Sequence, residues 1–337
     1  MAIPVQDASL FVSERRPPSR NPGYTRMFAR GRLSLGLFFP IEAFAGDMPA
    51  MRGQVALAQH AEAAGFAALW FRDVPLRVPS FGDTGQVYDP WVWLAHVSAS
   101  TSRIALATGS IVLPLRHPLH VAKAAASIDR LSGGRLVLGV ASGDRPEEFP
   151  AFGLEAESRG EIFRERFELI RRVHATHFPE AAGNWGQMAG ADIVPKPLAE
   201  GVPTLVTGRS RQSLDWIAAH ADGWVTYPRP PAHQRTQVDA WHAAVLRERP
   251  GEFLPFAQSL YVDLAHSPGE APSPIHLGWR LGRDPLRHLL EALQAAGVNH
   301  VALNLKYGQR DAAAVVEELA THIVPDFPVT PTFPGEP

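Results

Sequence analysis

The residues best suited to chemistry in this chain are small hydroxyl-bearing and basic side chains that directly follow apolar runs. In residues 206–213 (VTGRSRQS), an apolar run ends in a glycine turn, and two serines precede a helical pattern. Free backbone N–H groups at the start of a helix bind phosphate, and serine or arginine side chains can add hydrogen bonds. The candidate phosphate-binding residues are Gly208, Arg209, Ser210 and Ser213. The alternative is a plain N-cap at Ser210, with the arginines in solvent.

Two other apolar runs end in small residues that would let a cofactor approach the backbone. They are Thr108, Gly109 and Ser110 after the first run, and Ala141, Ser142 and Gly143 after the second. Glycine permits close approach, and the Ser142 hydroxyl could donate to a phosphate. The alternatives are a β-bulge at 108–110 and an ordinary turn at 141–143.

Three further side chains could transfer protons: His117, Asp73 and Tyr227. Imidazole changes charge near neutral pH, so His117 could act as a donor or proton carrier, and the alternative is a structural histidine that caps a helix. Asp73 follows Arg72, and we expect these two residues to form an internal ion pair ahead of any catalytic role. Tyr227 follows a short apolar run and could line the substrate side of a site.

The composition excludes several other kinds of chemistry. The chain has 337 residues, 45% of them apolar, and a net charge of −2, so its charge does not favour nucleic acid or an anionic membrane as a partner. It contains no cysteine, which excludes disulfides, thiolate nucleophiles and iron–sulfur clusters. The fourteen histidines lack H-x-x-x-H spacing, so we expect no metal site. No apolar stretch reaches about 18 residues, so we expect a cytoplasmic protein without a membrane span.

Strand and helix patterns alternate from residue 33 onward, and these elements must position the candidates. The expected strands cover residues 33–39, 67–71, 104–108, 136–141, 204–207, 223–226, 256–264 and 300–305. A helical pattern follows each strand, which predicts an α/β protein with a (β/α)8 TIM barrel rather than a doubly wound open sheet. We also expect an irregular hairpin at 178–202 and a long loop at 266–283.

We expect three parts in the chain: an N-terminal arm over 1–32, a single barrel domain with insertion loops over 33–325, and a C-terminal tail over 326–337. The arm is rich in arginine, proline and glycine, which favours a flexible or surface-draped segment. Active sites of such barrels lie at the C-terminal ends of the strands. This rule selects most of the candidates above and adds Phe39.

Four segments, residues 61–73, 89–118, 129–144 and 203–224, resemble the bacterial luciferase-like flavin-dependent monooxygenases. The resemblance extends over most of residues 33–325. It implies a (β/α)8 barrel that forms a homodimer through helices near the second and third strands. It also implies that reduced FMN, or the deazaflavin F420, binds at the strand ends.

Carried over residue by residue, the resemblance implies a cis peptide bond between Gly109 and Ser110 under the flavin ring. It also implies that Ser210 and Ser213, with the backbone N–H of Arg209, hold the flavin phosphate.

The chain departs from luciferase at three positions that the resemblance places near the flavin. Luciferase has a catalytic histidine after its second strand, where this chain has RDVP at 72–75. Ala141 stands beside the flavin where luciferase has a cysteine, and Ser142 stands where it has a phosphate-binding arginine. Arg209 or Arg211 could supply that charge instead. These departures put the aldehyde-oxidising reaction of luciferase in doubt for this chain.

The resemblance implies a flavin-dependent oxidoreductase, and we expect a monooxygenase that uses reduced FMN and O2 on a small organic substrate. A separate flavin reductase would supply the reduced FMN. The alternatives are an F420-dependent hydride-transfer enzyme, a non-catalytic flavin-binding protein, and a phosphate-binding aldolase or isomerase. The last of these would need a lysine at a strand end, for which only Lys306 qualifies.

Overall fold

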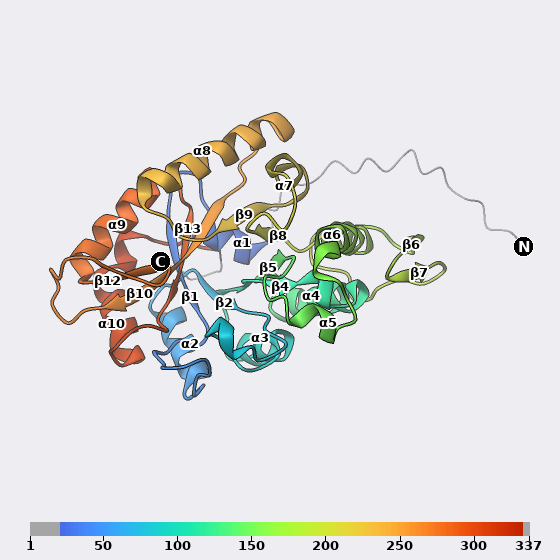
Figure 1. Cartoon of the computed structure of the whole chain (residues 1–337). Coiled ribbons are helices and arrows are strands. Elements are labelled where there is room, and N and C mark those ends of the chain that lie inside the picture. The colour runs from blue at the N-terminus through green and yellow to red at the C-terminus, as the bar shows by residue number, and fades with distance from the viewer. Residues whose placement is uncertain (1–20, 333–337) are drawn as a thin grey trace, which may run out of the picture.

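A closed barrel of parallel strands forms the centre of the computed structural model, which describes residues 21–332 (Figure 1). Its strands are β1 (Ser34–Phe38), β2 (Ala68–Phe71), β3 (Ala105–Thr108), β5 (Leu136–Ala141), β8 (Thr204–Thr207), β9 (Gly223–Thr226), β10 (Phe256–Leu264) and β13 (His300–Asn304). Neighbouring strands pair in parallel around the ring, and β13 pairs with β1 to close it. The predicted (β/α)8 barrel is confirmed, and the predicted strands differ from the observed ones only at single terminal residues.

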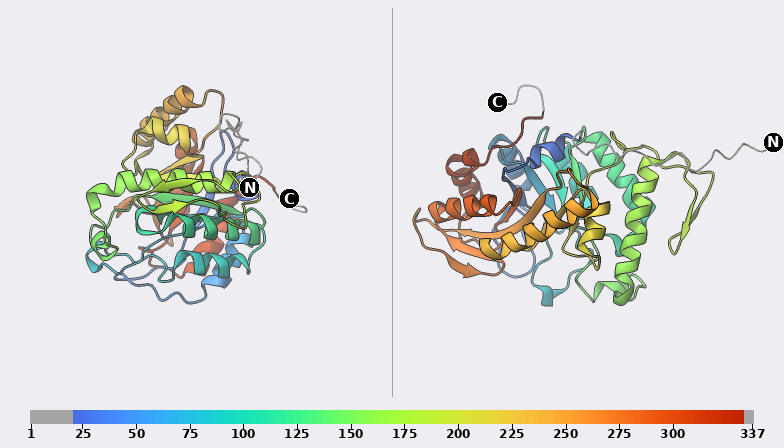
Figure 2. Two further views of the ribbon diagram at one scale, coloured as in Figure 1. Left: turned by 90° about the vertical axis from the view of Figure 1, so that its right-hand side faces the viewer. Right: turned by 90° about the horizontal axis from the view of Figure 1, so that it is seen from above.

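Helices surround the strands, as the views in Figure 2 show. They are α2 (Gln54–Ala63), α3 (Pro90–Ser98), α4 (Pro118–Leu131), α6 (Arg159–Ala175), α7 (Leu214–His220), α8 (Pro231–Glu248), α9 (Arg283–Ala295) and α10 (Ala312–His322). Side-chain caps define several helix starts: Asp89 accepts from the backbone N–H groups of Trp91 and Val92 before α3, and Asp311 accepts from Ala314 before α10. Such caps satisfy N–H groups that have no partner in the first turn.

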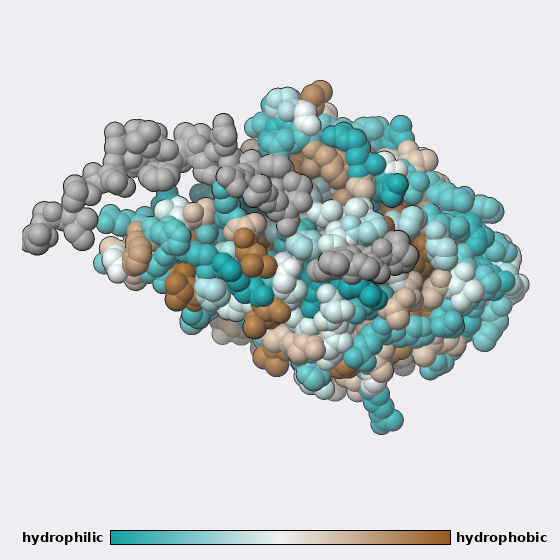
Figure 3. All heavy atoms as spheres, turned by 180° about the vertical axis from the view of Figure 1, so that it is seen from behind, coloured by the Kyte–Doolittle hydropathy of each residue, from teal (hydrophilic) through white to brown (hydrophobic). Residues whose placement is uncertain are grey.

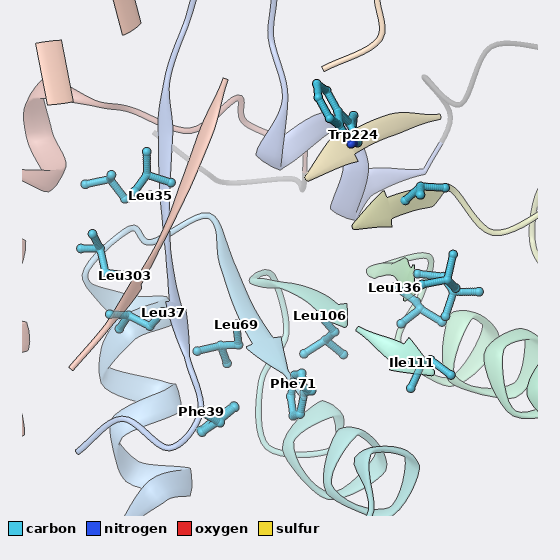
Figure 4. Packing of buried hydrophobic residues seen from close by; sticks show 14 of the residues in the cluster. Leu35, Leu37, Phe39, Leu69, Phe71, Leu106, Ile111, Leu136, Trp224 and Leu303 are labelled. Atoms are coloured by element: carbon cyan, nitrogen blue, oxygen red, sulfur yellow. The ribbon is translucent and has the colours of Figure 1, made fainter. Parts of the chain in front are cut away.

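Alternation along each strand divides the core into two layers. Leu35 and Leu37 of β1 join the cluster between the strands and the helices, part of which is shown in Figure 4. Phe38 of β1 and Trp70 of β2 belong to the separate cluster inside the barrel. Successive side chains leave a strand on opposite faces, which separates the two layers. The inner cluster contains many alanines, which leave space for the large indole of Trp70.

A chain of polar groups crosses the barrel interior. Trp70 Nε1 donates to His300 Nε2 (2.9 Å), and His300 Nδ1 lies 2.7 Å from Ser34 Oγ, which donates to Met27 O (2.6 Å). Because an indole N–H can only donate, His300 is neutral and carries its proton on Nδ1. Burial lowers the pKa of His300 to about 3, in agreement with a neutral ring.

Helix α1 (Pro22–Met27) lies at the N-terminal ends of the strands. Tyr24, Met27 and Phe28 pack into the inner cluster, and the Tyr24 hydroxyl donates to Asp222 O (2.7 Å). The predicted flexible or surface-draped arm is therefore wrong for residues 21–28, which are buried or partly buried, whereas residues 30–32 are exposed. The rest of the predicted arm, residues 1–20, lies outside the described residues.

Two insertions extend the barrel. Strands β6 (Ala181–Gly183) and β7 (Gly186–Met188) form the expected hairpin, which projects beyond α6 in Figure 1. The predicted long loop contains strands β11 (Ser273–Ile275) and β12 (Gly278–Leu281), and β12 pairs with β10. A further short strand, β4 (Ile111–Val112), continues beyond β3 and pairs with β5.

None of the described helices is both long and apolar enough to cross a lipid bilayer. On the face shown in Figure 3, hydrophobic residues occur as small groups among hydrophilic ones. This mixed pattern is ordinary for the surface of a globular domain.

Candidate functional site

Hydroxyl groups from the ends of β3 and β8 meet a backbone N–H group from the end of β5. Ser110 Oγ lies 2.5 Å from Thr207 Oγ1, and Ser210 Oγ donates to Thr207 O (2.9 Å) and accepts from Ser142 N (3.2 Å). We call these four residues the hydroxyl cluster. The structure thus brings together the predicted residues Ser110, Ser142 and Ser210. It adds Thr207, which lies at the start of the strand-end segment 207–213 but is not among the predicted cofactor-binding residues.

Glycines shape the backbone around the hydroxyl cluster. The peptide bond between Gly109 and Ser110 is cis, as predicted. A Cβ atom at Gly109 would lie 2.9 Å from ring atoms of Phe38 and Trp70, so the backbone of this bulge rests on the aromatic groups inside the barrel. Gly143 (φ +87°) and Gly208 (φ +58°) adopt left-handed conformations that favour glycine.

The other two predicted phosphate-binding residues, Arg209 and Ser213, lie at the surface. Ser213 caps α7 by accepting from Trp216 N (3.0 Å), and its side chain is exposed. The N-cap is therefore Ser213, and the alternative that placed the cap at Ser210 is wrong. The guanidinium of Arg209 lies over the Trp224 ring, 5.5 Å from its centroid. Arg209 and Arg211 are both exposed.

Two predicted cofactor contacts point away from the mouth of the barrel. Phe39 is fully buried and packs against Phe71 and Trp93 in the outer layer of the core (Figure 4). The prediction for Phe39 is wrong because strand alternation turns Phe38, and not Phe39, toward the barrel interior. The Thr108 hydroxyl is also buried and donates to Gly139 O (2.7 Å) within the barrel wall. Ala141 is partly exposed at the end of β5, where it was predicted.

His117 is the N-cap residue of α4, in agreement with the alternative of a structural histidine that caps a helix. Its Nδ1 accepts from Leu119 N (3.3 Å), so Nε2 carries the proton and donates to Trp185 O (3.2 Å) in the β6–β7 hairpin. The ring is exposed, and its described contacts lie in α4 and this hairpin, away from the hydroxyl cluster.

Asp73 and Arg72 both form ion pairs, but not with one another. Asp73 accepts two hydrogen bonds from Arg116 (2.7 Å each) and one from Val112 N (3.1 Å). Arg72 instead binds both oxygens of Asp83, at 2.7 and 3.2 Å. The predicted Arg72–Asp73 pair is wrong because consecutive residues at the end of a strand point to opposite faces. Asp73 has both carboxylate oxygens engaged, which favours a positioning role.

Tyr227 lies at the end of β9 and faces the loop that follows β5. Its hydroxyl donates to Asp144 Oδ2 (3.2 Å), and Asp144 lies two residues beyond Ser142. Burial, together with the negative charge of Asp144, raises the pKa of Tyr227 to about 12. At neutral pH the phenol is therefore protonated, and it can donate a proton but not accept one.

A charged group lies on the other side of the barrel mouth, and the sequence interpretation named two of its members, Arg72 and Lys306, without predicting that they belong to one group. We call Arg72, Asp83, Arg145, Tyr261 and Lys306 the Arg72 cluster. Its contacts centre on Asp83, whose carboxylate accepts from Arg72 and lies 3.4 Å from the Tyr261 hydroxyl, while its backbone O accepts from Arg145 (2.7 Å). Arg72 directly follows β2 and Lys306 lies two residues after β13, so the strand-end rule includes both, but it does not reveal that they share a group with Asp83, Arg145 and Tyr261.

Neutral hydroxyl and N–H donors beside small residues suit an organic cofactor with oxygen-rich substituents. Among residues 21–332, no group of three or more histidine, cysteine, aspartate or glutamate side chains could hold a metal ion. The hydroxyl cluster and the adjoining backbone of Gly109 and Ala141 are the part of the mouth with this character.

Comparisons with known proteins point to one family. A family model described as luciferase-like monooxygenase matches residues 33–327. An uncharacterised protein of Mycobacterium tuberculosis is 33% identical over 190 residues, which cover 52% of this chain and 67% of that protein. The alkanal monooxygenase alpha chain of Photorhabdus luminescens is 25% identical over 171 residues, which cover 50% of this chain and 46% of that protein.

Solved structures show the same fold. Monooxygenase RslO1 from Streptomyces bottropensis has a TM-score of 0.74 at 19% identity, with 87% of this chain and 99% of that chain covered. An F420-dependent secondary alcohol dehydrogenase has a TM-score of 0.71 at 16% identity, with 87% and 98% covered. The family model spans most of the sequence and the barrel agrees with these structures, so this chain belongs to the luciferase-like monooxygenase family.

Proposed function

We propose that this chain is a monooxygenase that binds reduced FMN at the ends of β3, β5 and β8. The observation that carries the proposal is the hydroxyl cluster, which three separate loops assemble. Its donors suit the ribityl and phosphate oxygens of a flavin. Bound reduced FMN would supply the electrons with which O2 yields water and one oxygen atom on a small organic substrate.

The residues of the chain would bind and orient these molecules. The bond from Ser142 N keeps the Ser210 oxygen in place, and the Ser210 hydroxyl would turn its one proton from Thr207 O to the flavin when the cofactor binds. Tyr227 would donate a hydrogen bond near the substrate, because its raised pKa keeps the phenol protonated at neutral pH and makes it a weak acid. Among the three predicted proton carriers it is the best placed, because His117 caps a helix and Asp73 is held by Arg116.

The second candidate is an oxidoreductase that uses F420 for hydride transfer without O2. Two of the similar solved structures are of F420-dependent enzymes, a secondary alcohol dehydrogenase and a tetrahydromethanopterin reductase. The hydroxyl cluster would serve F420 as well as FMN, because both cofactors carry a ribityl phosphate chain.

Titration of the purified protein with FMN and with F420, followed by absorbance and fluorescence, tests the proposal. We expect FMN to bind at one site per chain, and Ser210→Ala to weaken it roughly fivefold to tenfold, because a hydrogen bond contributes about 1 kcal/mol. Ser127→Ala is the matched control, since Ser127 Oγ only donates to Lys123 O on the exposed face of α4. Binding of F420 but not FMN, or an unchanged FMN dissociation constant in Ser210→Ala, would contradict the proposal.

Reaction with O2 separates the monooxygenase from a flavin-binding protein without turnover. We propose that a separate flavin reductase supplies reduced FMN in the cytoplasm, so O2 consumption is measured with such a reductase, NADH and FMN. Consumption that rises with a panel of small organic substrates is the expected result. FMN binding without any substrate-dependent O2 consumption would favour the non-catalytic alternative.

We also propose a homodimer that forms through the helices after β2 and β3. The apolar side chains of Val87, Tyr88 and Val92, at the start of α3, are 47%, 49% and 68% exposed and would supply part of such an interface. Light scattering during gel filtration should give twice the mass of the chain. Val92→Glu should lower that mass, and a monomeric wild type would contradict the dimer.

A further inference from the structure

The two polar clusters at the barrel mouth occupy different parts of the strand ring. The hydroxyl cluster lies at the ends of β3, β5 and β8, whereas Arg72 and Lys306 follow β2 and β13, and Tyr261 lies in the second half of β10. The hydroxyl cluster contains no charged side chain, while the Arg72 cluster contains two arginines and a lysine. A flavin held by the hydroxyl cluster would leave this cationic side of the mouth for another molecule.

Positive charge exceeds negative charge in the Arg72 cluster. The Asp83 carboxylate hydrogen-bonds to Arg72, the Asp83 backbone O accepts from Arg145, and the Lys306 ammonium group donates to Gly46 O (2.6 Å), with the Asp47 carboxylate as a nearby opposite charge. Glu148 lies 4.0 Å from Arg145, but burial raises the pKa of its carboxyl group to about 7 against the opposing effect of Arg145. Glu148 therefore cancels only part of the excess charge at neutral pH.

Some donors of the cluster also lack acceptors. Within residues 21–332, Arg72 Nε and Arg145 Nη1 are buried and form no hydrogen bond. The Arg145 and Arg72 side chains are only 8% and 14% exposed, so water satisfies them poorly. Buried guanidinium donors without acceptors are costly, and an oxyanion with several lone pairs would satisfy them.

Asp83 reaches the cluster from the loop that follows β2. It comes after the short turn η3 (Pro79–Phe81), whose residues are exposed, and it lies between Gly82 (φ +75°) and Gly85 (φ +61°). Its carboxylate binds the guanidinium of Arg72 through two parallel bonds, the arrangement in which arginine recognises a free carboxylate. The loop thus presents a carboxylate in the way that a small organic acid would.

Aromatic rings lie beside the groups that bind Asp83. The Arg72 guanidinium lies 6.0 Å from the Phe38 ring, and Tyr261 packs against Tyr307 with ring centroids 5.1 Å apart. Burial raises the pKa of Tyr261 to about 12, with Arg72 opposing and Asp83 assisting, so its hydroxyl remains a donor. The site combines cationic and hydroxyl donors with apolar walls, which suits an acid with a short carbon chain.

We propose that the Arg72 cluster binds the oxyanion group, a carboxylate or a sulfonate, of a small organic substrate, and that Asp83 holds this position until the substrate arrives. The inference rests on the proposed function, because the substrate would meet the flavin across the same barrel mouth. The substrate anion displaces the Asp83 carboxylate from Arg72, and the exposed turn at 79–82 moves with it.

Calorimetric titration tests the inference with butyrate and butane-1-sulfonate as probes and butyramide as the neutral analogue, all at one ionic strength. Asp83→Asn keeps the side-chain size and removes the competing charge, so both anions should bind this variant roughly tenfold more tightly than the wild type. The double variant Asp83→Asn/Arg72→Gln should lose that gain. Asp326→Asn is the matched control, because it breaks an exposed pair with Arg287 and should leave anion affinity unchanged.

The melting temperature is a second measurement, which tests the inference even if Asp83→Asn is less stable than the wild type. Asp83→Asn leaves Arg72 without a carboxylate, so its melting temperature should fall and should recover when butyrate or butane-1-sulfonate is added. The anion that binds with the higher affinity identifies the substrate class as a carboxylate or a sulfonate. Equal binding of anions to wild type and Asp83→Asn, or equal binding of butyramide, would overturn the inference.

Titrations with FMN separate this inference from the proposed function. We expect Arg72→Gln to leave FMN affinity unchanged, and weaker FMN binding would assign the cluster to the flavin and overturn the inference. If no variant binds flavin while Asp83→Asn still binds the anions, the proposed function fails and the anion site stands.

Discussion

Replacement of Asp73 should destabilise the barrel and leave flavin affinity intact. The Asp73 side chain is fully buried and accepts two bonds from Arg116 and one from Val112 N. Removal of one partner of a buried ion pair costs about 3–5 kcal/mol. Arg116 is 23% exposed and also binds Asp89 (2.8 Å), so it would keep a partner and some water. We therefore expect a loss of about 3 kcal/mol in Asp73→Ala and about 2 kcal/mol in Asp73→Asn, which can still accept from Val112 N.

Urea unfolding followed by tryptophan fluorescence measures these losses of stability, and FMN titration under native conditions measures the flavin affinity. Asp89→Asn is the matched control: asparagine also caps a helix well, and the Asp89 carboxylate is 41% exposed, so its loss should cost less than about 1 kcal/mol. Wild-type stability in Asp73→Asn, together with a lost pH dependence of O2 consumption, would refute the structural role and restore Asp73 as a proton carrier.

Three other changes test the packing around the site. Gly109→Ala places a Cβ atom 2.9 Å from the buried rings of Phe38 and Trp70, so we expect a loss of about 1–3 kcal/mol in urea unfolding; an unchanged midpoint would show that the rings move freely. His300 has a pKa of about 3 when folded and 6.5 in the absence of its surroundings, so the unfolded chain takes up the proton first. Stability should therefore fall as pH drops from 6.5 toward 3, by up to about 1.4 kcal/mol per pH unit from this group, and His300→Gln should flatten this part of the profile. An equally steep profile in His300→Gln would assign the effect to other groups. Tyr24→Phe leaves the buried Asp222 O without its donor at 2.7 Å, and a loss of about 1–2 kcal/mol would show that α1 supports the barrel, whereas no loss would return α1 to a peripheral role.

Most of the fold could be predicted from the pattern of strands and helices in the sequence. Apolar runs such as LVLGVA in β5 and FAQSLYVDL in β10 define buried strands, and the helical segments between them leave few other architectures. The same pattern placed Ser110, Ser142 and Ser210 at strand ends, where the structure brings them together. The cis bond between Gly109 and Ser110 was predicted from family resemblance and is present in the structure.

The errors arose where composition or adjacency replaced three-dimensional information. Composition suggested a surface segment that included residues 21–28, but Tyr24, Met27 and Phe28 enter the inner cluster. Adjacency suggested that Arg72 pairs with Asp73. Successive side chains of an extended segment point to opposite faces, so Arg72 binds Asp83 and Asp73 binds Arg116 instead.

The sequence by itself determined the closed barrel and the positions at which polar residues follow its strands, because periodicity and strand ends are local properties. Only the tertiary structure decided which of those residues share a site and which have other partners. Asp83 joins Arg72 from a loop eleven positions along the chain, and Ser210 meets Ser142 across 68 positions. Such partners are chosen by the closure of the ring and the course of its loops, so no short stretch of sequence records them.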